Sequence, residues 1–264
     1  VDEESEEQRS RNEPLVEVTQ IKGTSETHPL LSKNDEWAGF ELDAPGTGGG
    51  YVRDAYLRGL SIETGGVLNP YKFGLIGSSD THVAASSPDE ETYHGKLGVR
   101  DGTPIDRGSV PIKGVRRMLQ ETFLPPLVTQ IDGKVYEGLG FQQKWGASGL
   151  AGVWAEENTR EAIYDAFRRK ETFATTGPRI KVRFFAGYDW DEDMLGAEDM
   201  VSRAYSSGVP MGADLLSQEG KAPNFLVWAV RDSRGAPLQR VQIIKGYIRD
   251  GEHHEIVYDV ACSD

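Results

Sequence analysis

The sequence contains almost no cysteine and no long hydrophobic run, and each absence excludes a class of protein. Cys262 is the single cysteine in 264 residues, so the chain can form neither an internal disulfide framework nor a zinc site built from several thiolates. Both the cytosol and the periplasm stay open as compartments. No run of about 18 apolar residues occurs, so the sequence predicts no membrane-spanning helix.

Positive charge is also in short supply. The chain has 29 Lys and Arg residues against 42 Asp and Glu residues, which gives a formal net charge of −13. This balance argues against nucleic acid as a partner, because a phosphate backbone is bound by clustered Lys and Arg side chains. An acidic chain can hold metal cations, although solubility alone explains the charge equally well.

The apolar content of 38% is enough for a hydrophobic core, and the first third of the chain shows clear local patterns. Residues 1–13 are rich in charge and form either a solvated helix or a disordered segment. Alternating apolar and polar residues predict a strand over 14–20, and an apolar run predicts a short buried strand over 73–76. Between them, helical spacing predicts a helix over 51–63, which a pair of glycines ends.

The middle of the chain predicts a β–α–β unit. A helix is expected over 158–170, where Asn158 and Glu161 have the spacing of a capping box. Strand-like apolar segments flank it at 149–155 and 179–185. Strands on either side of a helix indicate a parallel sheet or a barrel wall.

Two further stretches differ in their sequence patterns from the rest of the chain. Residues 84–146 show little pattern apart from a short predicted helix over 114–120, and they are either functional loops or a segment that wraps another part of a longer protein. We place a domain boundary near residue 205. It divides the chain into a larger part, residues 1–205, and a smaller part, residues 206–264. Beyond it, short turns separate strand-like segments, which predicts a small antiparallel β module. These segments are 224–231, 238–245 and 255–260.

The most informative motif is Asp80-Thr-His82, which comes after the predicted strand over 73–76. Side chains two positions apart in a strand point to the same side, so at a strand end both can converge on one metal ion. The carboxyl ends of the strands are also where active sites lie in closed α/β barrels. Ser-Asp-Thr is common in turns too, because Asp and Ser side chains bond to nearby backbone groups. Spacing alone leaves both interpretations open.

These residues carry a resemblance to a known superfamily. Asp80-Thr-His82 after an apolar strand resembles the last metal motif of the polymerase and histidinol phosphatase (PHP) superfamily. Several longer blocks are similar to a bacterial family of PHP-like proteins that is known as a domain of unknown function. These blocks are residues 16–28, 69–82, 152–160, 172–180 and 242–246. Together they extend over nearly the whole chain.

The resemblance implies a fold and an activity. PHP proteins are metal-dependent phosphoesterases on a distorted (β/α)7 barrel, so we expect an α/β fold with part of such a barrel, followed by the antiparallel β module. Asp80 and His82 are then ligands of divalent zinc, manganese or iron, which activates water against a phosphoester or another small-molecule substrate. A bacterial protein of this kind is cytoplasmic or periplasmic.

One part of the PHP pattern is missing. PHP sites begin with a His-X-His pair, and this chain has none. His253 and His254 are adjacent, so in a strand they face opposite sides. We therefore expect the chain to be the C-terminal portion of such a protein, with the first ligands outside it. Because catalytic zinc normally has three protein ligands, we expect this chain alone to bind metal weakly and to lack hydrolase activity.

Other residues are candidates to complete or support the site. Glu26 and His28 repeat the same spacing, and they either line the site, cap a turn or lie at the surface. Glu17 lies on the predicted strand over 14–20, where the resemblance implies that it supports a ligand by hydrogen bonding. His94 either reaches the site from a loop or is a solvated histidine.

Lys22 and Arg53 are candidates for binding a substrate phosphate, since both are cations near the predicted site elements. For each of them, a surface position or an ion pair is the alternative. A rival function also stays open for the whole chain. In it, the chain is a non-enzymatic binding protein, in which the barrel is degenerate and the β module recognises carbohydrate or a partner protein.

Overall fold

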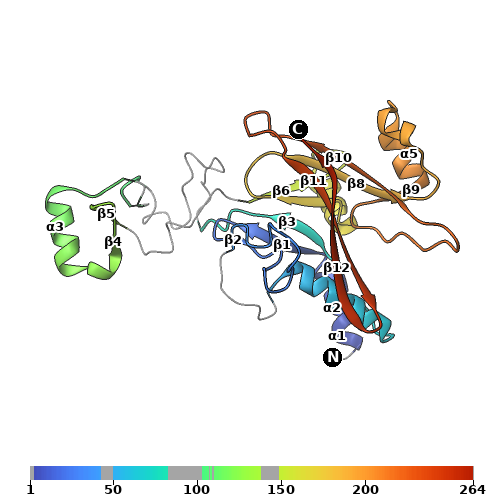
Figure 1. The fold of residues 1–264 in the computed structure, drawn as a ribbon, viewed down its shortest axis with the longest axis horizontal. Coiled ribbons are helices and arrows are strands. Elements are labelled where there is room, and N and C mark those ends of the chain that lie inside the picture. Colours follow the sequence, from blue (N-terminus) through green and yellow to red (C-terminus); the bar gives the residue numbers. More distant parts are fainter. Residues whose placement is uncertain are drawn as a thin grey trace.

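The computed structural model describes residues 3–42, 50–82, 103–106, 108, 110–137 and 149–263. Over these ranges the chain is a mixed α/β structure with several small, mostly antiparallel sheets, none of which closes into a barrel (Figure 1). The same ranges contain no helix long and apolar enough to cross a membrane. The α/β class is therefore confirmed, and the part of the chain that is described shows separate sheets in place of a closed barrel.

One sheet contains the two strands predicted in the first part of the chain. It has the order β2–β1–β3, with β1 over Leu15–Gln20, β2 over Gly23–Thr24 and β3 over Gly74–Gly77. β1 is antiparallel to β2 and parallel to β3. A parallel pair needs a long crossover connection, and here the chain passes through a helix before it enters β3.

This part of the chain contains two helices, one where the sequence left a helix and disorder open and one where it predicted a helix. α1 covers Glu3–Asn12, so the charged segment is a helix. α2 covers Val52–Thr64 and ends at Gly65, as predicted. The hydroxyl of Tyr56 donates a hydrogen bond of 2.9 Å to the carbonyl oxygen of Phe73, which attaches α2 to the residue before β3.

The predicted parallel β–α–β unit is wrong. β6 (Leu150–Val153) and β7 (Thr172–Thr175) flank α4 (Arg160–Arg169) and pair with each other in antiparallel fashion. Lys170 ends the helix in the left-handed conformation, with φ of 62°, and the chain enters β7 two residues later. This tight reversal brings β7 back beside β6. The prediction overlooked β7 and paired the helix with the next strand, which belongs to another sheet.

The start of α4 also differs from its prediction. The side-chain oxygen of Thr159, one residue after the predicted cap Asn158, accepts a hydrogen bond of 3.3 Å from the backbone N–H of Ala162. Threonine at this position satisfies one of the amides that a helix leaves unpaired at its start.

A second sheet has the order β10–β8–β9 and is antiparallel throughout. It consists of β8 (Lys181–Gly187), β9 (Gly208–Pro210) and β10 (Asn224–Val230). The 3-10 turn η4 (Glu192–Gly196) and α5 (Met200–Ser207) pack against it. The buried cluster between them is Phe185, Met194, Ala204 and Leu226. Since β8 pairs with β10, this sheet includes strands from both sides of position 205, and the boundary predicted there stays a prediction.

The last part of the chain forms a long antiparallel hairpin from two of the three strands predicted for the β module. The third predicted strand, β10, belongs to the sheet with β8 instead. β11 covers Arg240–Arg249 and β12 covers Glu252–Cys262. Asp250 and Gly251 make the turn, with φ of 53° and 79°. Positive φ at both positions is typical of the type I′ turn that suits a two-residue hairpin loop. The hairpin extends across the molecule to α2 (Figure 1).

The stretch predicted to have little pattern contains a further hairpin. α3 covers Gly114–Phe123 and includes the short predicted helix, and the 3-10 turn η2 covers Pro125–Leu127. β4 (Val128–Ile131) and β5 (Lys134–Glu137) then pair in antiparallel fashion. The Asp-Gly turn between them is a recognised hairpin signal that the prediction missed. This unit lies at one end of the molecule (Figure 1).

Candidate functional site

The loop from Ser78 to His82 lies at the carboxyl end of β3, beside the end of β1. The backbone N–H of Ser78 donates to the carbonyl oxygen of Thr19 at 3.0 Å, so the loop begins as a continuation of the parallel pair. The register of β1 against β3 shifts between Glu17 and Thr19, which marks a β-bulge. Glu17 accepts a hydrogen bond from the hydroxyl of Ser78, so it contacts the loop that carries Asp80.

Asp80 brings a carboxylate, an ammonium and an imidazole together. Its φ of 49° lies in the left-handed region, which residues other than glycine rarely adopt. One carboxylate oxygen lies 3.4 Å from Nζ of Lys22, and the other lies 3.7 Å from Nε2 of His82. The second distance is longer than a hydrogen bond. The side chain of His82 is 58% exposed and that of Asp80 is 21% exposed, so solvent reaches the imidazole.

Close backbone contacts hold the base of this loop in place. A Cβ atom on Gly77 would lie 2.7 Å from the carbonyl oxygen of Leu150 and 2.9 Å from that of Thr175. A Cβ atom on Gly149 would lie 2.9 Å from the carbonyl oxygen of Ser78. Real Cβ atoms do not approach backbone so closely, so both positions require glycine. β6 and β7 therefore support the loop directly through backbone contacts.

Glu26 belongs to a different ionic cluster, which is centred on Arg53. The guanidinium lies 2.5 Å from Glu26, 2.7 Å from Asp35 and 3.4 Å from Glu255. Burial lowers the pKa of Arg53, but the three carboxylates outweigh this effect and raise the pKa above its usual value. The side chains of Arg53 and Asp35 are 13% and 3% exposed, so the cluster is mostly buried. These contacts match the ion-pair alternative for Arg53, and its binding of a phosphate stays a prediction.

His28 contacts its own turn and a neighbouring ring. Its Nδ1 accepts a hydrogen bond of 3.1 Å from the backbone N–H of Leu30. Its ring centroid lies 5.6 Å from that of Tyr51, the residue before α2. These contacts match the turn-capping alternative, and a place for His28 in the site stays a prediction.

The residues of the loop do not by themselves fit a complete metal centre. A carboxylate and an imidazole have suitable donor atoms, but a catalytic divalent metal normally takes three or more protein ligands. In the ranges that the structure describes, no group of three or more His, Cys, Asp and Glu side chains is arranged to hold an ion. Lys22 also places a positive charge beside Asp80. His94 lies outside those ranges.

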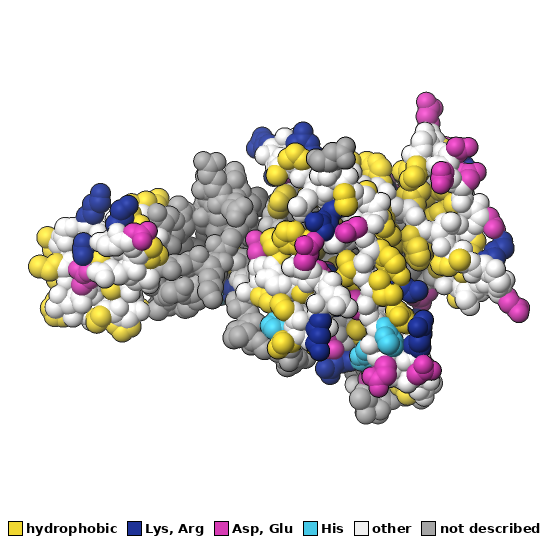
Figure 2. All heavy atoms as spheres, viewed as in Figure 1, with side chains coloured by type: hydrophobic (Ala, Val, Ile, Leu, Met, Phe, Trp, Pro, Cys, Tyr) yellow, Lys and Arg dark blue, Asp and Glu magenta, His cyan; other side chains and the backbone are white. Residues whose placement is uncertain are grey.

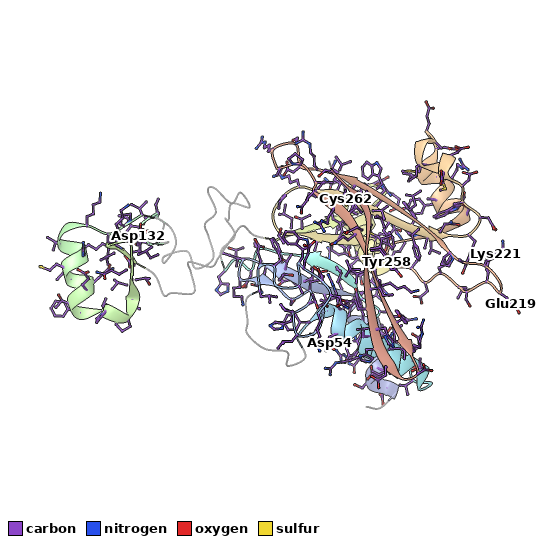
Figure 3. All side chains as sticks on the ribbon, viewed as in Figure 1. Asp54, Asp132, Glu219, Lys221, Tyr258 and Cys262 are labelled. Atoms are coloured by element: carbon purple, nitrogen blue, oxygen red, sulfur yellow. The ribbon has the colours of Figure 1, made fainter. Side chains whose placement is uncertain are left out.

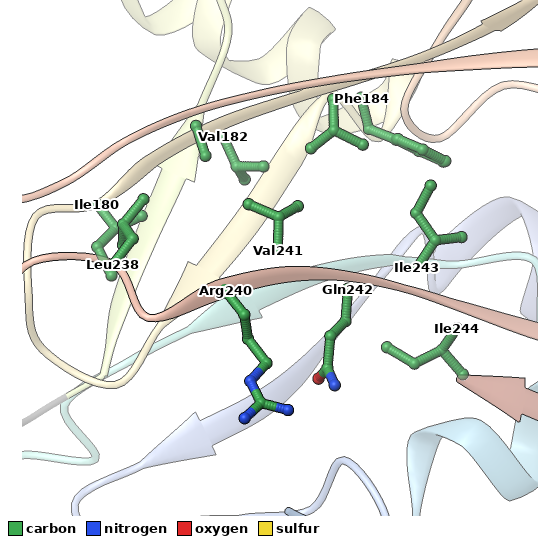
Figure 4. Close-up of a pocket in the computed structure, with 11 residues that line it drawn as sticks. Ile180, Val182, Phe184, Leu238, Arg240, Val241, Gln242, Ile243 and Ile244 are labelled. Carbon is green, nitrogen blue, oxygen red and sulfur yellow. The ribbon is translucent and has the colours of Figure 1, made fainter. Parts of the chain in front are cut away.

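Two hollows lie in the second half of the chain. One has a volume of about 410 Å³ and lies between β8, β10 and β11. Apolar side chains line it: Figure 4 shows Val241 directed toward Val182 across the hollow, whereas Arg240 points away. Hydrophobic side chains are also exposed on the face that carries the β11–β12 hairpin (Figure 2). The second hollow has a volume of about 530 Å³ and is lined by aromatic and polar residues beside α5. Neither hollow was predicted from the sequence, and the one local signal for the second is the loop segment Tyr188-Asp-Trp190.

Comparison with known proteins matched the chain to a family model over its whole length. The family is described as a protein of unknown function (DUF3604), and the match covers residues 1–264. Comparisons with curated proteins and with solved structures gave no match. The match assigns no activity, so the function has to be inferred from the residues and their geometry.

Proposed function

We propose that this chain, which belongs to the DUF3604 family, is part of a metal-dependent hydrolase with a PHP-like site that acts on phosphoesters. One observation carries the proposal: Asp80 and His82 lie together at the carboxyl end of a parallel strand, with Nε2 3.7 Å from the carboxylate. A carboxylate and an imidazole at such a strand end are donors suited to divalent metals. Further ligands must come from outside the described residues, because two are too few.

The surroundings of the loop support this assignment. Its base is held by the hydrogen bond to Glu17 and by the backbone contacts at Gly77 and Gly149, while its tip is exposed to solvent. A catalytic site needs side chains that are held in position yet accessible to substrate. The left-handed backbone of Asp80 adds to this support, since conformations of this kind concentrate at functional sites.

Lys22 has two roles in the proposal. Without substrate, its ammonium balances the charge of Asp80 across 3.4 Å. The lysine side chain is 40% exposed, so breaking this ion pair costs at most about 1 kcal/mol. With substrate present, the same ammonium is positioned to bind an anionic phosphoryl oxygen.

Metal binding by the full-length protein tests the proposal. We expect Asp80→Asn and His82→Gln to lower the affinity for Mn²⁺ or Zn²⁺ by at least about tenfold, and to reduce hydrolysis of generic nitrophenyl phosphoesters. Asp132→Asn is the matched control, because Asp132 also has a left-handed φ, 48°, but lies in the β4–β5 turn. Figure 3 shows it at the far end of the molecule.

Elemental analysis and titration calorimetry are the measurements. Unchanged metal content and unchanged turnover in both site variants would overturn the proposal. A stoichiometric, tightly bound metal in the 264-residue chain alone would contradict the expectation that this chain lacks part of the ligand set.

A further inference from the structure

The second hollow, beside α5, is a built pocket with mixed chemistry. Its walls come from residues 188–190 after β8, from Arg203, Ser206 and Ser207 of α5, and from Gln218. Its volume of about 530 Å³ lies within the roughly 300–1,000 Å³ that is usual for small-molecule sites. It shares no residue with the Asp80 loop, so a ligand bound here is independent of the proposed hydrolase site.

One wall is an indole ring in a fixed orientation. Gly187 and Gly208 are direct partners in the β8–β9 register, and the ring of Trp190 lies over both. A Cβ atom on either glycine would come within 2.4 Å of the ring, so both positions need glycine. The indole N–H donates to the hydroxyl of Ser207 at 2.8 Å, which sets the ring's rotation.

The ring of Tyr188 fixes the segment 216–218, whose Gln218 forms another wall of the pocket. The hydroxyl of Tyr188 donates to the carbonyl oxygen of Leu216 at 3.1 Å and accepts from the backbone N–H of Gln218 at 3.2 Å. The segment that carries Gln218 is thereby attached to the loop after β8. Between the two aromatic residues, Asp189 has φ of 61° and forms an ion pair with Lys221, which lies at the edge of the molecule (Figure 3).

The polar groups of the pocket are hydroxyls, an amide, a guanidinium and the carboxylate of Asp189, whose charge is balanced by Lys221. Ser206 and Ser207 each donate to the carbonyl oxygen of Arg203, at 3.0 and 2.8 Å. Both hydroxyls can still accept from a ligand, although Ser207 already accepts from the indole N–H of Trp190. Arg203 offers up to five N–H donors, and Gln218 offers both donors and an acceptor. This set suits a ligand that carries several neutral hydroxyl groups.

We infer that this pocket binds a neutral saccharide. The ring C–H groups of a sugar would lie against Trp190 and Tyr188, whose rings combine an apolar face with a polar edge. Its hydroxyls would exchange hydrogen bonds with Arg203, Gln218 and the serine hydroxyls. The polar lining disfavours a purely apolar ligand, and the net charge of −13 disfavours a polyanionic one.

Affinity electrophoresis of the full chain tests this inference. The gels contain one neutral polysaccharide each (laminarin, xylan or dextran), with alginate as the anionic arm and EDTA in a parallel series. We expect retardation by at least one neutral polysaccharide, unchanged by EDTA, with affinity lowered about tenfold in Arg203→Ala and in Gln218→Ala. Arg160→Ala, an exposed substitution on α4, is the control and should bind as the unsubstituted chain does.

Tryptophan fluorescence provides a second readout, because Trp190 lies in the pocket wall. The retarding polysaccharide should change the emission of the unsubstituted chain, and Trp190→Phe should remove most of that change. The inference is overturned by no retardation in any neutral gel or by retardation in alginate alone. It is also overturned if the Arg203 and Gln218 variants bind as tightly as the unsubstituted chain. Loss of binding in EDTA would also overturn it, since that result would assign the sugar to a metal site.

Discussion

Glu26-Thr-His28 and Asp80-Thr-His82 have the same spacing but different surroundings. In the first segment, Glu26 binds the mostly buried Arg53, and His28 accepts a backbone N–H. In the second, Asp80 has the exposed Lys22 beside it, and His82 is open to solvent. A carboxylate and an imidazole two residues apart therefore acquire their role from the cation that reaches them.

The two cations differ in a way that explains the two outcomes. A guanidinium is planar and offers a rigid fork of donors, so Arg53 can bind three carboxylates at once. An ammonium on a flexible stem, such as that of Lys22, is a single point charge that is easily displaced. The Arg53 cluster is therefore expected to stabilise the fold, whereas the Asp80 loop has a weaker ion pair and a His82 side chain that is 58% exposed.

Of the substitutions that test this comparison, Arg53→Met should lower the free energy of unfolding most. The substitution leaves Asp35, Glu26 and Glu255 close together without their shared cation, so we expect the free energy of unfolding to fall by about 3–4 kcal/mol. Urea unfolding measures it, with Arg160→Ala as an exposed control. A loss below about 1 kcal/mol would show that the cluster contributes no more than a surface ion pair.

Gly149→Ala should have the next largest effect, on the Asp80 loop. The new Cβ atom would overlap the carbonyl oxygens of Thr19 and Ser78, at 2.7 and 2.9 Å, so the backbone must shift. We expect a loss of about 2–3 kcal/mol in urea unfolding. Gly196→Ala is the matched control, because nothing lies within 4 Å of its added Cβ atom. Equal stability of the two variants would contradict a loop base held by backbone contacts.

Substituting a partner of Arg53 should lower the free energy of unfolding more, the more buried that partner is. Asp35→Asn removes a charge that is 3% exposed, and we expect it to cost about 2 kcal/mol. Glu26→Gln removes one that is 47% exposed, and we expect it to cost at most about 1 kcal/mol. Glu26→Gln should also leave Mn²⁺ affinity unchanged. A drop in that affinity would instead place Glu26 in the metal site and remove the distinction between the two segments.

Lys22→Met should have the smallest effect on stability. It should raise the affinity for metal, whereas Asp80→Asn should lower it. The side chain of Lys22 is 40% exposed, so the cost in unfolding should stay below about 0.5 kcal/mol. Removing the ammonium takes a positive charge away from the carboxylate of Asp80, so calorimetry should show Mn²⁺ affinity several-fold higher. Weaker Mn²⁺ binding in this variant would contradict the expected repulsion between the Lys22 ammonium and a metal ion at Asp80.

Elements with a strong local pattern could be predicted from the sequence. β1, α2 and β3 lie within one or two residues of their predicted ranges, because alternation, helical spacing and glycine stops act between neighbours. The pairing of β6 with β7 could not be predicted, since strand pairing depends on the packing of the whole sheet and the left-handed Lys170 carries no strong signal. The β4–β5 hairpin was not predicted, although its Asp-Gly turn is a strong sequence signal for a hairpin.

The candidate site could be predicted only in part. The place of Asp80 and His82 at a strand end was predicted from the apolar run before them. The partners of Arg53 were not, because Asp35, Glu26 and Glu255 are 18, 27 and 202 positions away in the chain. The same is true of the pocket beside α5, where residues 188–190 meet Gln218.

By itself, the sequence determined the α/β class, the place of Asp80 and His82 at the end of a strand, and the exclusion of a disulfide framework. These depend on composition and on patterns between near neighbours, which need no knowledge of the rest of the fold. The tertiary structure alone decided that Glu26 meets a buried arginine while Asp80 meets an exposed lysine. It also formed the pocket at Trp190, because contacts between distant residues depend on how the sheets pack.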